Sequence, residues 1–249
     1  MKTILFVILP YLCLAIFVVG HLWRYRYDKF GWTTRSSQLY ESRLLRIGSP
    51  LFHFGTLFAI IGHAMGLLLP KKWTDGFGIS QELYHAIAVV GGLAAGVAVV
   101  GGMAILVYRR RTNATVFSAT TRNDKLMYAV LGTTIALGMW NTIGTALGAN
   151  HHFNYRESVS VWFRQLFWLQ PNPDLIASAP IQFQLHAILA FLLFALWPFT
   201  RLVHVFSAPV GYFTRPYIVY RSAGDAPGSP TGPRTPQGTW DSPTGARRR

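Results

Sequence analysis

The long apolar runs of this 249-residue chain contain no Asp, Glu, Lys or Arg. Charged residues make up only 13% of the chain and hydrophobic residues 51%, which excludes an ordinary soluble domain and a disordered chain. A helix of roughly 20 apolar residues crosses a bilayer. Five runs approach that length, at residues 4–22, 50–69, 83–107, 126–148 and 180–200. The sequence therefore predicts an all-α, polytopic membrane protein with five transmembrane helices.

Cysteine is almost absent, since Cys13 is the only one. One cysteine excludes an intramolecular disulfide, a cysteine-based metal site and the covalent attachment of a c-type haem. Any haem in this protein would therefore be held without covalent bonds to the chain.

Basic residues are distributed unequally between the two sides of the predicted membrane. With the amino terminus outside, 18 Lys and Arg residues lie on the inner side and 5 on the outer side. Because basic residues stay on the cytoplasmic side, we expect an N-out, C-in chain. The net charge of +14 is then a topology signal, and we expect no nucleic-acid partner.

Three segments flank or join the predicted spans. The first run lacks a small-residue cleavage site before its basic flank, so we expect it to be retained as a span. Residues 222–249, rich in Pro, Gly and Ser, predict a disordered basic cytoplasmic tail after a membrane domain at 1–221. The segment 161–169 predicts a short interfacial helix, with Trp162 and Trp168 at the lipid headgroups.

Glycines recur in the second and third runs at a spacing of four. Gly62 with Gly66, and Gly92 with Gly96, would let a neighbouring helix or a flat cofactor approach the backbone. Helix packing without a cofactor is the commoner reason for this pattern, so the glycines alone do not indicate a haem.

Histidine is the ionisable residue that the spans do contain. Buried ionisable groups in a membrane usually mark function, and the absence of a buried carboxylate argues against a proton-coupled transporter. Neutral imidazole ligates iron through one ring nitrogen while the other donates a hydrogen bond. Six of the eight histidines lie within the spans or at their ends: His21, His53, His63, His85, His186 and His204.

Four of these histidines are predicted to lie at two matched depths. At about 1.5 Å per residue, His63 and His186 both lie roughly 20 Å from the inner face. His53 and His204 both lie near the inner boundary, and the 18 residues from His186 to His204 amount to about five turns. The sequence thus predicts two bis-histidine haems between the second and fifth helices. Because the spacing is about 15 Å on one helix and 27 Å on the other, tilt, inclined haem planes or a kink at Pro198 must absorb the difference.

The remaining histidines have plainer interpretations. We expect His21 to be a packing residue. His85 could compete as a ligand or hydrogen-bond a lipid-soluble substrate. For His151 and His152, in a polar outer loop, solvated or loop-stabilising roles are expected.

Around the four paired histidines the chain resembles the gamma, or cytochrome b, subunit of membrane-bound respiratory nitrate reductase. The resemblance covers roughly residues 1–221, and its clearest segments are SPLFHFG, IGHAMGLLLP, FQLHAIL and WPFTRLVHVFSAPVGYFTRPY. It implies a protein with two b haems that oxidises quinol near the outer haem. Electrons then pass inward to an iron–sulfur subunit and on to a molybdenum subunit that reduces nitrate. The family's ligand pairs agree with the depth argument: His63 and His186 at the outer, distal haem, and His53 and His204 at the inner, proximal one.

The resemblance also bears on the residues around the haems. Arg201 matches an arginine of the family and could pair with a haem propionate, although anchoring at the inner face explains it equally well. Family members with a lysine in the quinol pocket have it where this chain has Leu83 to His85, without a lysine. We therefore assign quinol contact to Gly66 and His85, and leave open whether the quinol is menaquinol or ubiquinol.

Two other classes of protein remain as alternatives. A dihaem cytochrome b could serve a heterodisulfide-reductase-like complex or a ferric reductase. A non-redox transporter or assembly scaffold would use the same histidines only for packing.

Overall fold

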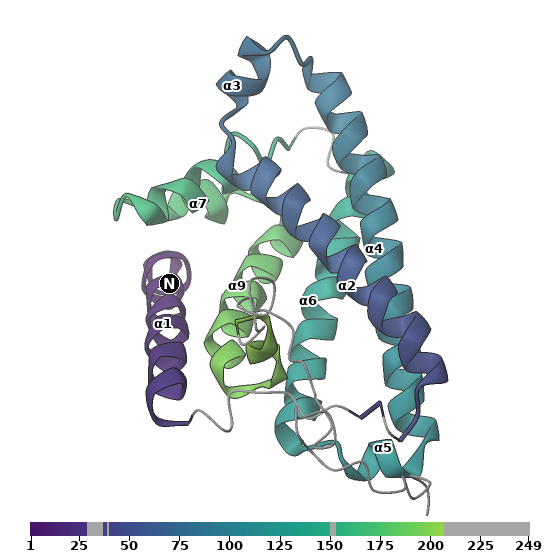
Figure 1. Ribbon diagram of the computed structural model, residues 1–249. Coiled ribbons are helices and arrows are strands. Elements are labelled where there is room, and N and C mark those ends of the chain that lie inside the picture. Colours follow the sequence, from purple (N-terminus) through teal and green to yellow (C-terminus); the bar gives the residue numbers. More distant parts are fainter. Residues whose placement is uncertain (29–36, 39, 150–152, 207–249) are drawn as a thin grey trace, which may run out of the picture. The chain divides into compact units, whose positions relative to one another are not determined.

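The computed structural model describes residues 1–28, 37–38, 40–149 and 153–206, and every regular element among them is helical (Figure 1). Five helices are long and apolar enough to cross a membrane, as predicted: Ile4–Tyr27, Arg43–Leu68, Gln81–Thr112, Arg122–Ala146 and Ile181–Phe199. The predicted tail at 222–249, the domain limit at 221, and His151 and His152 lie outside the described residues.

The long helices extend beyond the apolar runs into their polar flanks. Helix α4 (Gln81–Thr112) starts where the Ser80 side chain accepts a hydrogen bond from the Leu83 amide. Helix α6 (Arg122–Ala146) starts with a reciprocal capping box between Thr121 and Asp124. Such caps satisfy amide groups that the helix leaves unpaired, so these two spans begin at residues that the sequence defines.

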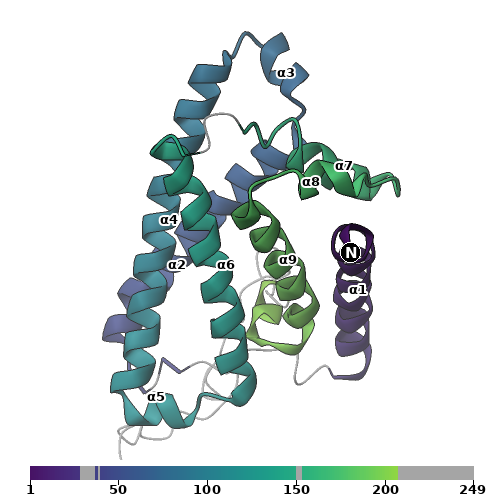
Figure 2. The same cartoon turned by 180° about the vertical axis from the view of Figure 1, so that it is seen from behind.

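The long helices pack in a defined order of neighbours (Figures 1 and 2). Helix α2 (Arg43–His63) packs along α4, α4 along α6, α6 along α9 (Ile181–Leu196), and α9 along α1 (Leu9–Tyr27). Within the described part of the chain, α2 and α9 are not among the helix pairs that pack extensively. Helices α2 and α9, which carry three of the four predicted ligands, are therefore held by other helices.

Glycines bring α2 and α4 together, but at positions other than those singled out from the sequence. A Cβ atom on Gly55 would lie 2.9 Å from the Ala98 Cβ, and one on Gly48 would lie 2.8 Å from Ile105. Of the predicted pairs, Gly92 faces Thr142 of α6, whereas nothing lies within 4 Å of a Cβ on Gly62. The interface therefore depends on glycines for close approach, as is common in membranes.

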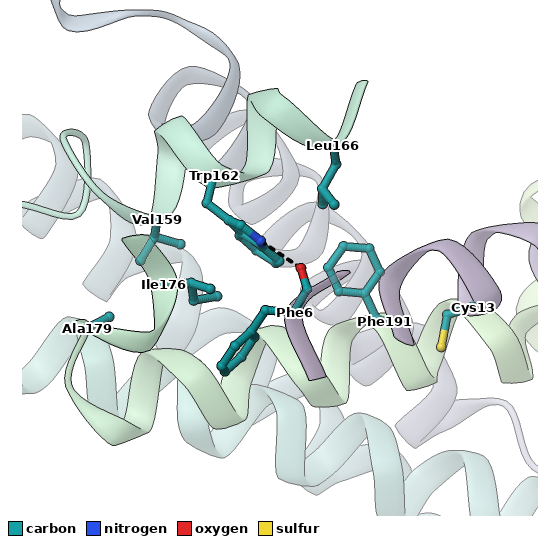
Figure 3. Close-up of a cluster of buried hydrophobic side chains, with 8 residues drawn as sticks. All are labelled: Phe6, Cys13, Val159, Trp162, Leu166, Ile176, Ala179 and Phe191. Carbon is teal, nitrogen blue, oxygen red and sulfur yellow. Dashed lines mark hydrogen bonds between the residues drawn. The ribbon is translucent and has the colours of Figure 1, made fainter. Parts of the chain in front are cut away.

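A buried apolar cluster joins the start of the chain to the segment between α6 and α9 (Figure 3). Trp162, on α7 (Val159–Phe167), is 1% exposed, and its Nε1 donates to the Phe6 carbonyl at 2.8 Å. Phe6 lies in η1 (Ile4–Ile8), the π-helical start of the first span. The predicted short helix is thus present, but placing Trp162 at the headgroups was wrong, because its indole is needed to fill this core. Trp168 is 77% exposed.

Helix α2 continues directly into a π-helical segment, η2 (Ala64–Leu68), right after His63. Two side chains of α7 bind its carbonyls: Ser160 Oγ donates to Gly66 at 2.8 Å and Arg164 Nη1 donates to Leu67 at 2.9 Å. These donors satisfy carbonyls at a helix end. Three further short helices lie in the connections: α3 (Lys71–Gly76), α5 (Ala114–Ser118) and α8 (Pro173–Ala177).

The last span does not continue as one helix to His204. Two 3₁₀ segments follow α9, namely η3 (Trp197–Phe199), which contains Pro198, and η4 (Arg201–Val205). Thr200 between them is extended, with φ −119° and ψ 177°. The five-turn argument was therefore wrong, because it assumed a continuous helix, but the break at Pro198 that would absorb the spacing difference is present.

Candidate cofactor site

Four of the predicted histidines form two pairs. The rings of His63 and His186 have centroids 6.0 Å apart and planes inclined by 29°. The rings of His53 and His204 have centroids 5.9 Å apart and planes inclined by 69°. Each pair joins α2 to α9 or to the segment that follows α9, so the structure brings together the partners that the depth argument matched.

A backbone carbonyl holds the Nδ1 atom of every one of these rings. The acceptors are Ala59 O for His63 at 2.7 Å, Ser49 O for His53 at 2.7 Å, Thr134 O for His186 at 3.0 Å and Arg201 O for His204 at 2.6 Å. A carbonyl can only accept, so Nδ1 carries the hydrogen and the lone pair of the neutral ring lies on Nε2. This is the arrangement that orients an imidazole as a metal ligand.

The spacing of each pair fits one metal between two rings. Imidazoles on opposite sides of a metal, each at a bond of about 2.0 Å, have ring centroids roughly 6 Å apart. The described residues contain no group of three or more His, Cys, Asp or Glu side chains suited to a bare metal ion. A haem needs only two axial protein ligands, because the porphyrin supplies the rest. The two pairs therefore fit b-type haem better than a protein-ligated ion.

Helix α6 supports the His63–His186 pair. The Thr134 carbonyl holds the His186 ring, and Gly138, one turn later, lies under it. A Cβ on Gly138 would lie 3.0 Å from His186 Cε1 and 3.6 Å from Nδ1. Only glycine leaves the ring its ordinary contact distance here.

An ion pair supports the His53–His204 pair from the start of α6. Arg201 donates to both carboxylate oxygens of Asp124, at 2.7 and 2.8 Å, and its own carbonyl accepts from His204. Burial alone would lower the pKa of Arg201, but the Asp124 carboxylate outweighs it and raises the pKa above its ordinary value. The predicted propionate contact of Arg201 stays a prediction, and the structure shows its bidentate pairing with Asp124.

The two predicted quinol-contact residues have different surroundings. Gly66 is buried, and a Cβ there would lie 3.0 Å from the Tyr155 hydroxyl. That hydroxyl lies 3.5 Å from the hydroxyl of Tyr84, and His85 follows on α4 with an exposed side chain. Burial, and then the contact with Tyr84, raises the pKa of Tyr155, so its hydroxyl keeps its proton at neutral pH. Tyr155 thus contacts Gly66, and it also contacts Tyr84, which precedes His85 in the sequence.

The family model for the nitrate reductase gamma subunit matches residues 2–223. The chain belongs to that family. It is 42% identical over 219 residues to the nitrate reductase gamma chain of Bacillus subtilis, which covers 88% of this chain and 97% of that one. It is 34% identical to the respiratory nitrate reductase 2 gamma chain of Escherichia coli, over 86% of this chain and 94% of that one.

A further relative is much longer. The nitrate reductase-like protein NarX of Mycobacterium tuberculosis is 56% identical over 225 residues, which are 89% of this chain and 34% of that protein. The chain therefore spans about a third of that relative's length. Its apolar helices and its family together make this gamma-family chain a multi-pass membrane protein.

Sequence reasoning missed the residues that position the ligands in this gamma-family chain. Asp124 could have been noticed, because Thr121 and Asp124 form a visible capping pattern. Gly138 carries no such signal, since it is one small residue in an apolar run. The Thr134 carbonyl is a backbone group, which only the fold reveals.

Proposed function

We propose that the chain is the membrane electron-transfer subunit of a respiratory nitrate reductase, and that it holds two b-type haems. His63 and His186 would ligate one haem, and His53 and His204 the other. Haems held by these two histidine pairs would supply one-electron transfer, and no nitrate chemistry is assigned to them. Nitrate reduction is therefore assigned to a molybdenum subunit, reached through an iron–sulfur subunit on the cytoplasmic side.

The observation that supports this proposal best is that both histidine pairs have the same arrangement. In both pairs, the rings lie about 6 Å apart and come from segments that are far apart in sequence. Both also have each Nδ1 fixed by a carbonyl. The pairing of two rings is the feature that separates these histidines from a packing residue, because His21 also has its Nδ1 held by a carbonyl, Phe17 O at 2.7 Å.

Quinol is assigned to the end of the molecule where η2 meets the start of α4. Gly66 and Tyr155 would line the site beside the quinol ring. His85 would accept a hydrogen bond, and then a proton, from a quinol hydroxyl. A ring nitrogen of neutral imidazole is a hydrogen-bond acceptor and a common general base, which suits this role. The predicted N-out, C-in orientation would release such protons outside, and its support is the distribution of basic residues.

The test is to count haems in purified chain and in histidine variants, by reduced-minus-oxidised optical spectra and pyridine haemochromogen assay. We expect two haems per chain. His63→Ala and His186→Ala should each remove the same haem, and His53→Ala and His204→Ala the other. His21→Ala is the matched control, since His21 packs against Phe17 and Phe206. Two intact haem signals in any of the four ligand variants would contradict the pairing.

A further inference from the structure

A groove lies where η2, α3 and α7 meet, and it contains none of the four paired histidines. It has a volume of about 480 Å³. Its walls include Leu68, Lys72, Trp73, Val161, Arg164 and Trp168. We call it the α3–α7 groove. Because Leu68 ends the second apolar span, we expect the groove to lie at the boundary between the hydrocarbon and the aqueous phase.

The groove holds two cations without a carboxylate partner. Within the described part of the chain, no Asp or Glu forms an ion pair with Lys72 or Arg164. Other lysines at this end are paired: Lys2 with Asp174 at 3.0 Å and Lys71 with Glu157 at 2.6 Å. Among the described residues, Lys71 is thus paired and lies outside the groove lining, whereas its neighbour Lys72 lines the groove and has no carboxylate partner.

Arg164 is held in place by the fold. Its Nη1 donates to the Leu67 carbonyl, which fixes the guanidinium at the groove. Burial, and then the nearby cation of Arg156, lowers the pKa of Arg164. A fixed cation in a site that already disfavours positive charge would gain from an anionic ligand.

The rest of the wall is apolar and aromatic. Trp73 is 55% exposed and Trp168 is 77% exposed. Tryptophan is enriched at the level of lipid headgroups because its ring is amphipathic. A small hydrated anion would gain little from these walls, whereas a lipid would use both the cations and the aromatic surface.

We propose that the α3–α7 groove binds an anionic glycerophospholipid from the leaflet on this side of the membrane. The phosphodiester lies between Lys72 and Arg164, and the glycerol and upper acyl chains lie against Trp73, Trp168 and Leu68. The proposal does not depend on the haems.

The test is to titrate the purified full-length chain in detergent with dioleoyl phosphatidylglycerol or dioleoyl phosphatidylcholine, and to count bound lipids by native mass spectrometry. We expect phosphatidylglycerol to bind more tightly than phosphatidylcholine. Lys72→Gln with Arg164→Gln should weaken phosphatidylglycerol binding by roughly ten- to thirty-fold, since each cation near a lipid surface contributes about fivefold. Lys71→Gln is the matched control, because Lys71 is the adjacent lysine and is already paired.

Four results would overturn the proposal. These are equal affinity for the two lipids, an equal loss in the Lys71→Gln control, displacement of phosphatidylglycerol by millimolar inorganic phosphate, and unchanged binding in the double variant. If Arg164→Gln fails to fold because the Leu67 contact is lost, Lys72→Gln alone must still weaken binding by about fivefold.

Discussion

Replacing Asp124 by Asn would test how one ion pair supports one histidine pair. The carboxylate accepts two bonds from Arg201 and a third from the Thr121 amide, and its side chain is 6% exposed. Asparagine keeps one acceptor and loses the charge, so Arg201 is left partly buried without a counter-charge. Because breaking a buried pair is costly and the Arg201 side chain is 24% exposed, we expect a loss of about 2–3 kcal/mol.

The Asp124→Asn substitution should lower the stability of the whole chain and also disturb the His53–His204 pair in particular. Thermal unfolding followed by tryptophan fluorescence should show a midpoint lowered by roughly 5–10 °C. Since the Arg201 carbonyl holds His204, the spectrum and midpoint potential assigned to the His53–His204 haem should change, while those of the His63–His186 haem stay as they were.

The matched control is Glu157→Gln, which breaks the more exposed pair with Lys71. The Glu157 side chain is 57% exposed and the Lys71 side chain 37%, so we expect the free energy of unfolding to fall by less than about 1 kcal/mol. The reasoning would be refuted if both variants had the same unfolding midpoint, or if Asp124→Asn disturbed both haem signals equally.

Three further predictions concern close packing at two glycines and the protonation of Glu41. Gly138→Ala should push the His186 ring by a few tenths of an ångström and shift one haem potential without loss of haem; unchanged potentials would contradict the contact. Gly55→Ala should destabilise the chain by about 1–3 kcal/mol by separating α2 from α4, whereas Gly91→Ala, with nothing within 4 Å, should be neutral or stabilising in the same unfolding assay. Desolvation raises the pKa of Glu41, but bonds from the Leu44 amide and from Arg109 outweigh it and leave the pKa lowered. Its stabilising effect on the start of α2 is therefore present at neutral pH and lost in acid, so the hydrogen-exchange protection factors there, corrected for the intrinsic exchange rate at each pH, should fall as pH falls, and Glu41→Gln should remove that dependence.

The spans and the ligand pairs could be predicted because both follow from simple distances. An apolar run of about 20 residues has few options other than crossing a membrane, and the rise per residue then fixes the depth of each histidine. His63 and His186 are paired for that reason, although they lie 123 positions apart in the sequence.

The course of the chain after α9 could be predicted only in part. Pro198 indicated a break, but not that Thr200 would be extended and that a separate 3₁₀ segment would present His204. Trp162 was misplaced because composition places tryptophans at an interface, whereas its burial depends on Phe6, 156 residues away. Contacts between such distant residues are set by tertiary packing and leave no local pattern.

The weak direct packing of α2 on α9 has a consequence for assembly. One side of the protein consists of α2 with α4, and the other of α9 with α1, with α6 joining them. Across the seam, His53 faces His204 and His63 faces His186. A prosthetic group bound between those rings would join the two halves directly, in addition to α6, so its removal should loosen the bundle along this seam.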